Sequence, residues 1–409
     1  MKLWFKYLLG ISLGIFLSFV LPPSVYSDGK AFKTILEISI RLGSLMLSAL
    51  LFFSIPLAVY KLFENQEFWK YSGKNIAFFL LSLFAMGIVG LLIGISTAPM
   101  RIPLLSDTAS QPIAGVSSIL LKIVPANLAD VFTNSTEYLL PMILLAYALG
   151  LAFAHDPLMV RPLMSLSDVL SRTLYLINTF ITEILGALLI PISAASAHAV
   201  WISLSSGVYN AFYLLLLGEF VFFIFVATPA MFYFASGKMN PFPALYALTG
   251  PALAAFVSGN LRFAAGCLVK HANENLGIKR RYSNISLPIG IFFGRAGTAL
   301  VTAATFIAIL SSYSQISLSF FSLLGIVFLV PSVAVIGGLA PQQGPIIAIT
   351  LLCSFFGKGF ENGYLTVVPL ALPLSMFAAL MDTIWIGAVS AAIAQRQNLR
   401  ELKSPKNYI

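Results

Sequence analysis

Long apolar runs are the feature of this sequence that most restricts its fold. They lie near residues 3–22, 33–62, 75–97, 113–154, 166–198 and 207–236. A helix needs roughly 20 apolar residues to cross a bilayer, whereas the strands of a membrane barrel read as short alternating segments. Only 10% of the 409 residues are charged, against about 25% in a soluble domain. The chain is therefore expected to be an all-α polytopic membrane protein embedded in a lipid bilayer.

Two later apolar segments are interrupted by glycine, proline and small polar residues. The segment 243–270 is broken by TGP and SGN, and the segment 325–356 is broken by IGGLAPQQGP. Each is followed by a long apolar helix that we expect to be intact, at 283–313 and at 364–395. Irregular backbone at membrane depth is tolerated only inside protein or beside a wet cavity, and paired broken segments indicate a transporter's binding site. We therefore expect two re-entrant hairpins that belong to an internal repeat.

Lysines and arginines gather in loops that share one side of the membrane if both broken segments re-enter. They lie before the first run, after the second run, around the first broken segment and after the last helix. By the positive-inside rule, both termini are expected to be cytoplasmic. The same clustering of basic residues explains the net charge of +9, so no nucleic-acid partner is expected. The first run is expected to be an uncleaved helix, because further spans follow it. Compact loops and short termini are typical of a bacterial inner (plasma) membrane protein.

One ionisable residue lies near the middle of each long helix that follows a broken segment. These residues are Arg295 and Asp382, and insertion scales put either at roughly 2.5–3.5 kcal/mol in mid-membrane. Both side chains should therefore face protein or water, and we expect them to lie together beside the tips of the two broken segments. One alternative is a site in which Arg295 binds an anion and Asp382 binds a cation, an ammonium group or a proton. The other is an ion pair that only locks two helices together.

Other polar residues in the apolar segments fit secondary roles. Arg262 is a second candidate for an anion contact, while Glu183 and Glu219 are expected to be buried and to form hydrogen bonds between helices. Cys267 and Cys353 lie in apolar surroundings, which argues against a disulfide framework and against a zinc cluster. Because no Ser/His, paired-Asp or HExxH-like arrangement is present, an intramembrane enzyme is not expected.

The stretch SNISLPIGIFFGRAGTAL at 283–300 resembles the seventh-helix signature of the dicarboxylate/amino acid:cation symporters, the glutamate transporter family. GPALAAFVSGN falls where that family has its first hairpin tip, and IGGLAPQQGP falls where it has its second. NLADVFTNSTEYLLPMILLAYALGLAF resembles the fourth transmembrane region, and FFLLSLFAMGIV resembles the third. The chain is thus similar to a divergent member of this family over most of its length.

The resemblance implies eight transmembrane helices and two re-entrant helical hairpins in an elevator-type homotrimer. Residues 1–70 and 113–205 would form the scaffold that makes the oligomer (helices 1, 2, 4 and 5). Residues 71–112 and 206–398 would form the transport part (helices 3, 6, 7 and 8 with both hairpins), and residues 399–409 would be a cytoplasmic tail. The second hairpin would act as the gate.

The resemblance also implies where substrate binds. The implied contacts are Ser258, Gly259, Asn260, Gly337, Gly338, Ala340, Arg295, Gly297, Thr298, Ser375 and Asp382. Small residues at the tips would let backbone groups reach the ligand. Arg295 would replace the family's eighth-helix arginine, because a guanidinium matches a carboxylate at two points.

Departures from the family pattern fall mainly on its sodium ligands. The Asn and Asp of the seventh-helix signature are Gly294 and Ala296 here, and the family's sodium-binding aspartate of helix 8 is Ile386. No cofactor is expected, and Na⁺ is a possible coupling ion. The positions left for residual sodium sites are Gly290, Gly294, Asp382 and Ser82. Coupling to protons through Asp382 is the alternative, because a buried carboxylate favours its protonated form unless it is paired.

The expected function is therefore a secondary active symporter for a small organic anion or amino acid, coupled to sodium or protons. Two alternatives remain open at this point. One is a passive anion channel, and the other is a transport-dead relative with a structural or sensing role.

Overall fold

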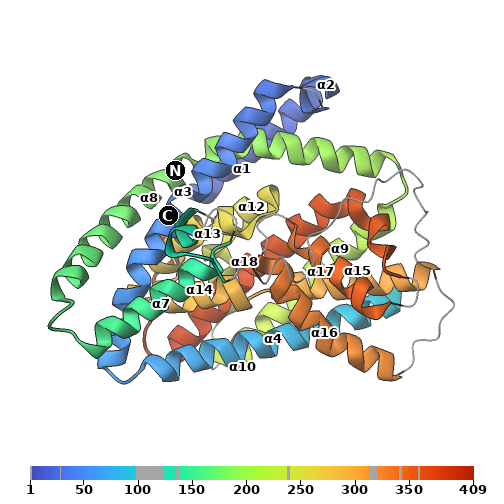
Figure 1. Cartoon of the computed structure of the whole chain (residues 1–409). Coiled ribbons are helices and arrows are strands. Elements are labelled where there is room, and N and C mark those ends of the chain that lie inside the picture. Colours follow the sequence, from blue (N-terminus) through green and yellow to red (C-terminus); the bar gives the residue numbers. More distant parts are fainter. Residues whose placement is uncertain are drawn as a thin grey trace.

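A computed structural model describes residues 2–27, 29–97, 121, 124–133, 138–236, 240–313, 320–339, 343–357 and 360–409 of the chain. Within these ranges the architecture is helical from end to end (Figure 1). Eight of the described helices are long and apolar enough to cross a membrane. Many large apolar side chains on their outer faces are exposed, such as Phe16, Phe19, Leu214 and Phe328, as expected for surfaces that face lipid. The chain is an integral membrane protein of the polytopic helical class.

The first half of the chain supplies long helices and one very long arch. α8, of 45 residues, curves over the other helices in Figure 1. The helices of this half are α1 (Leu3–Val20), α2 (Pro23–Ser27), α3 (Lys30–Glu64), α4 (Phe68–Thr97), α6 (Leu128–Thr133), α7 (Leu140–His155) and α8 (Arg161–Ser205). Residues 113–120, 122–123 and 134–137 of the expected fourth apolar run, 113–154, lie outside the described residues; α6 and α7 lie in its described part.

Small residues let α1 approach α8 closely. A Cβ atom on Gly10 would lie 2.0 Å from the carbonyl oxygen of Gly186, and a Cβ on Gly14 would lie 1.8 Å from Ser193 Oγ. Contacts through small residues are a common way to pack helices in a bilayer, where the lipid gives no hydrophobic drive for association. α3 packs against both α7 and α8, so these four helices form one connected group.

The second half of the chain contains the two broken segments and the helices that follow them. Its elements are α9 (Asn210–Phe222), the π-helix η2 (Phe223–Ala227), α10 (Thr228–Ser236), α11 (Pro241–Ala247), α12 (Thr249–Ser258), α13 (Leu261–Glu274), α14 (Arg280–Phe293), α15 (Ala296–Tyr313), α16 (Phe320–Leu339), α17 (Gly344–Phe356), the 3-10 helix η3 (Gly363–Leu370), α18 (Ala371–Arg396) and the 3-10 helix η4 (Pro405–Asn407).

The first broken segment turns back at Gly259 and Asn260, as the SGN triplet predicts. Gly259 adopts a left-handed conformation (φ 60°), which a glycine tolerates without steric cost. Asn260 is extended, and its side-chain oxygen accepts a hydrogen bond from the Arg262 amide at 2.9 Å, which caps α13. Hairpin 1, formed by α11, α12 and α13, packs against α18 on one side and against α1, α3 and α8 on the other.

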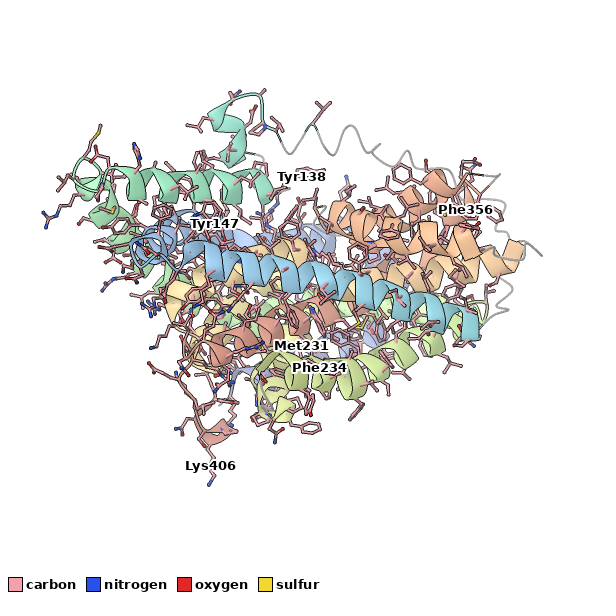
Figure 2. All side chains as sticks on the ribbon, turned by 90° about the horizontal axis from the view of Figure 1, so that it is seen from below. Tyr138, Tyr147, Met231, Phe234, Phe356 and Lys406 are labelled. Atoms are coloured by element: carbon pink, nitrogen blue, oxygen red, sulfur yellow. The ribbon has the colours of Figure 1, made fainter. Side chains whose placement is uncertain are left out.

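The second broken segment is helical further than the sequence predicts. Gly337 and Gly338 lie in the last turn of α16 rather than in an irregular tip, and Ala340 lies outside the described residues. Hairpin 2, formed by α16 and α17, packs against α4, α15 and α18. Phe356, at the end of α17, lies toward the opposite end of the molecule from Tyr147 of α7 (Figure 2).

The expectation of an intact helix at 283–313 is wrong. α14 ends at Phe293 and α15 begins at Ala296, so Gly294 and Arg295 interrupt the span. Gly294 has ψ 39°, outside the helical range, and glycine is a poor helix former. Arg295 precedes the first turn of α15, and its carbonyl accepts the Ala299 amide at 2.9 Å. This interruption places the start of a helix near the middle of the candidate membrane span Arg280–Ser312.

Both ends of the chain lie on the same side of the molecule (Figure 1). The Lys2 ammonium donates to the Tyr246 hydroxyl at 3.1 Å and to the Pro405 carbonyl at 3.4 Å. Ile409 donates its amide to Asn275 Oδ1 at 3.0 Å. The segment 399–409 is thus packed against the base of hairpin 1.

Candidate functional site

Arg295 and Asp382 lie together at the break between α14 and α15. Arg295 Nη1 is 3.8 Å from Asp382 Oδ2; the Asp382 side chain is buried, and 13% of the Arg295 side chain is exposed. Sequence reasoning expected this proximity because each charge is costly alone in the membrane. Since a buried ion pair is weak evidence for added stability, the distance alone does not distinguish a binding site from a helix lock.

Asp382 is also bound to the beginning of α15. Its Oδ1 accepts the Thr298 amide at 3.0 Å, and its Oδ2 accepts the Thr298 hydroxyl at 2.6 Å. The first amides of a helix have no partner inside the helix, and the helix dipole favours negative charge at that end. The break at Gly294 and Arg295 therefore creates the donors that hold this carboxylate.

Gly297 gives α18 the room to come this close. A Cβ atom on Gly297 would lie 2.5 Å from Met381 Cβ and 2.9 Å from the Ala378 carbonyl oxygen. Gly297 thus acts through packing, while Thr298 contacts the carboxylate directly.

Arg295 also joins the tip of hairpin 2. Its Nη2 donates to the Gly338 carbonyl oxygen at 2.5 Å, and a Cβ atom on Gly338 would lie 2.5 Å from Arg295 Nε. Only a residue without a side chain lets the guanidinium lie against the backbone here. Arg295 therefore connects Asp382 on α18 with the last turn of α16.

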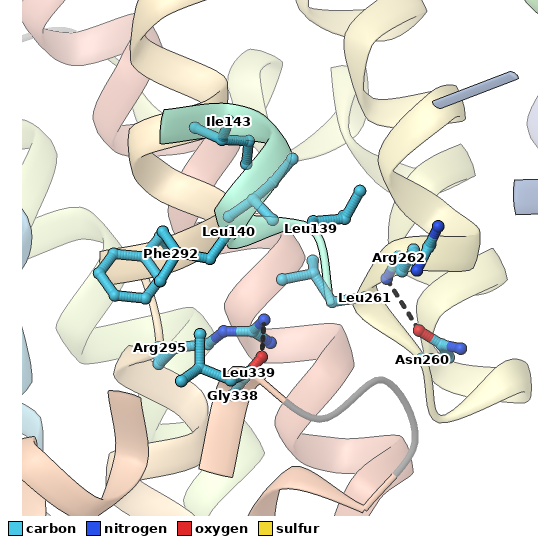
Figure 3. Close-up of a pocket in the computed structure, with 11 residues that line it drawn as sticks. Leu139, Leu140, Ile143, Asn260, Leu261, Arg262, Phe292, Arg295, Gly338 and Leu339 are labelled. Carbon is cyan, nitrogen blue, oxygen red and sulfur yellow. Dashed lines mark hydrogen bonds between the residues drawn. The ribbon is translucent and has the colours of Figure 1, made fainter. Parts of the chain in front are cut away.

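A cavity opens beside the guanidinium, between the two hairpins and α7 (Figure 3). The empty space is about 460 Å³ when the open mouth is included. Arg262 and Arg295 both line it, so its wall carries two cations. The remaining lining residues are Leu139, Leu140, Ile143, Asn260, Leu261, Ile291, Phe292, Gly338 and Leu339.

A second, smaller cavity lies on the Asp382 side of Arg295. It is lined by Gly259 of the hairpin 1 tip, by Thr298, and by Ser375, Ala378 and Asp382 of α18, with Gly344 and Pro345 at the start of α17. Both hairpins therefore contribute to it. Arg295 lines both cavities and stands between them.

Three of the predicted contacts line neither cavity: Gly297, which packs against α18 as described above, and Ser258 and Gly337. Ser258 donates its hydroxyl to the Ala254 carbonyl at 2.7 Å within α12. Gly337 packs α16 on α17, because a Cβ atom there would lie 2.4 Å from the Gly344 carbonyl oxygen. Ser258 and Gly337 shape the hairpins rather than line the space between them.

The positions proposed for residual sodium binding lie among packed side chains. A Cβ atom on Gly290 or on Gly294 would lie 2.6 Å from a side-chain carbon of Ile386, so an apolar side chain fills that space. Ser82 Oγ accepts the Trp385 indole at 2.9 Å and donates to the Phe79 carbonyl at 2.7 Å. Of the four positions, Asp382 alone supplies a carboxylate, and Thr298 already engages it.

The sequence missed the apolar wall from α7 and an ion-pair cluster beside hairpin 1. Leu139, Leu140 and Ile143 line the larger cavity, but nothing in an apolar stretch distinguishes them from lipid-facing residues. Glu183 is not buried as expected: its partly exposed carboxylate accepts from Lys6 at 2.5 Å and from the buried Lys270 at 3.0 Å. A lysine inside a predicted hairpin was a signal for such a partner.

Paired broken segments in a helical membrane protein are typical of transporters. The model of the sodium:dicarboxylate symporter family matches residues 3–396. The chain therefore belongs to the sodium:dicarboxylate symporter family, as its resemblance in sequence predicted. Proteins of this family are cation-coupled transporters rather than enzymes.

Proposed function

We propose that this protein is a secondary active symporter for a small organic anion or amino acid of the dicarboxylate or glutamate type. The observation that carries the proposal is the position of Arg295: its guanidinium lies beside a cavity bounded by both hairpins and by α7. A guanidinium recognises a carboxylate through two parallel hydrogen bonds. Arg262, on the same cavity wall, would receive the second acidic group of a dicarboxylate.

Arg295 would exchange partners when substrate binds. In the present arrangement it donates to the Gly338 carbonyl, and a substrate carboxylate would take this place. The tip of hairpin 2 would then be released from Arg295 and would close over the ligand, so that hairpin 2 acts as the gate. Asp382 would have one of two roles. It would either fix the start of α15 and orient the Arg295 side chain, or contact the ammonium group of an amino-acid substrate.

The transport part, residues 71–112 and 206–398, would move as an elevator against residues 1–70 and 113–205. The close packing of α1, α3, α7 and α8 supports a separate static group. In this proposal the protein is a homotrimer of the bacterial inner membrane with cytoplasmic termini. The coupling ion would be a cation, either sodium or a proton.

Counterflow in proteoliposomes tests the proposal. Vesicles loaded with unlabelled four-carbon dicarboxylate, aspartate or glutamate are diluted into the labelled compound. A carrier accumulates label transiently, and Arg295→Gln should abolish this accumulation, while Arg172→Gln, which removes an exposed arginine on α8, should leave it unchanged. Uptake without trans-stimulation would indicate a passive channel instead. No uptake of any of these compounds would support the transport-dead alternative.

A further inference from the structure

Glu219 is a buried carboxyl group that the binding site does not use. It lies on α9 with no exposed surface, and neither of its carboxyl oxygens has a hydrogen-bond partner among the described residues. Sequence reasoning expected a hydrogen bond between helices here, and that expectation is wrong. Burying an unpartnered carboxylate costs several kcal/mol even after relaxation, so the group requires an explanation.

Within the described residues, the helices that pack around Glu219 offer it no counter-ion. α9 packs against α4, α15 and α18. α4 has no ionisable side chain from Asn75 to Thr97, and α15 has none from Ala296 to Ser312. α18 carries Asp382, which is engaged with Arg295 and Thr298, and Arg396 at its far end.

Two residues that follow Glu219 in the chain make aromatic contacts with α18. One residue further along α9, Phe220 contacts Phe377 with ring centroids 6.3 Å apart. One turn further, Phe223 contacts Trp385 at 5.5 Å. Hard cations need several converging oxygen ligands, and no group of three acidic, histidine or cysteine side chains occurs in the described part of the chain. A single proton is the one cation that neutralises a carboxylate without further ligands.

The backbone next to Glu219 is irregular. The π-helix η2 begins at Phe223, one turn after Glu219, and the Thr228 hydroxyl donates to the Phe223 carbonyl at 2.8 Å. Wide turns of this kind are rare inside helices and occur frequently at functional sites. The feature supports a functional rather than a purely structural role for this part of the helix.

We propose that Glu219 is a proton-binding site, separate from the Arg295–Asp382 site, and that it is protonated in the arrangement described here. The equilibrium is a simple one, in which the carboxylate takes up one proton from water and becomes a neutral acid. The neutral form is compatible with the apolar packing around Phe220, Phe223 and Trp385, and the charged form is not. A role in coupling rests on the proposed symporter function. In such a symporter, Glu219 would carry the proton whose movement drives transport.

Infrared difference spectroscopy of the purified protein tests the protonation directly and requires no transport. We expect the wild type at neutral pH to show the carbonyl stretch of a protonated carboxylic acid. The band should be lost in Glu219→Gln and in the apolar variant Glu219→Leu, which guards against failure of one variant to fold. Glu183→Gln, which removes a partly exposed, ion-paired carboxylate, should keep the band. A spectrum that loses ionised carboxylate bands in the Glu219 variants would overturn the proposal.

Transport separates proton coupling from substrate binding. Glu219→Gln should retain counterflow, which needs no net proton movement, and should lose accumulation driven by a pH gradient. If Glu219→Gln keeps gradient-driven accumulation, Glu219 does not carry the coupling proton. If the wild type shows no counterflow, the symporter proposal fails, while the infrared result still decides the protonation of Glu219.

Discussion

Asp382 and Glu219 are two fully buried carboxyl groups on neighbouring helices with opposite surroundings. Asp382 is close to Arg295 and accepts two hydrogen bonds from Thr298, whereas Glu219 accepts none within the described residues. A carboxyl group inside the membrane can be charged where the fold supplies hydrogen-bond donors and a counter-ion. Without them, the carboxyl group must be neutral. The break in the α14–α15 span makes the difference, because it exposes helix amides to Asp382.

The largest effect should come from removing the partnered carboxylate. Asp382→Ala leaves the largely buried Arg295 without its counter-ion, and breaking a fully buried pair costs roughly 3–5 kcal/mol, which is the upper limit expected here. Thermal unfolding of the purified protein, followed by intrinsic fluorescence, measures the loss. An unfolding temperature equal to that of the wild type would mean that Arg295 is not paired with Asp382.

A smaller loss is expected when one donor to Asp382 is removed. Thr298→Val keeps the shape of the side chain but deletes its hydroxyl, and a hydrogen bond to a charged group contributes about 1.5–3 kcal/mol. Thr302→Val is a matched control, because the buried Thr302 hydroxyl has no partner in the described part of the chain. Equal stability of the two variants would contradict the hydrogen bond.

The smallest effect is expected when the same chemical change is made at Glu219. Glu219→Gln replaces one neutral group by another, so the free energy of unfolding should change by less than about 1 kcal/mol. Asp382→Asn, by contrast, removes a charge that Arg295 needs and should destabilise clearly more. If the two amide variants are equally unstable, Glu219 is charged and the comparison fails.

The sequence predicted the parts of the site that contain residues with a high free-energy cost of insertion into a membrane. Arg295 and Asp382 were predicted to meet because lone charges in lipid are rare, and the turn at Gly259 followed from residues that end helices. The extent of α16 through Gly337 and Gly338 was not predicted, because glycine marks a weak point in a helix without fixing where the helix ends.

The break at Gly294 and the apolar wall from α7 were also missed. Leu139 and Ile143 carry no chemistry that separates a cavity wall from a lipid-facing surface, since both are apolar. Their role depends on where α7 packs in three dimensions. The missing partner of Glu219 is likewise a property of packing, which a hydrophobic sequence pattern does not reveal.

Ligand-dependent thermal stabilisation of the purified protein tests the central claim that Arg295 binds a substrate carboxylate between the two hairpins. Stabilisation should rise with the logarithm of ligand concentration above the dissociation constant. The account predicts that a four-carbon dicarboxylate or an acidic amino acid stabilises the wild type. Arg295→Lys, which keeps the charge but loses the two-point fork, should need roughly 10–100-fold more ligand, about 1.4–2.8 kcal/mol. Equal stabilisation of the wild type and Arg295→Lys, or stabilisation of neither by any of these anions, would contradict it.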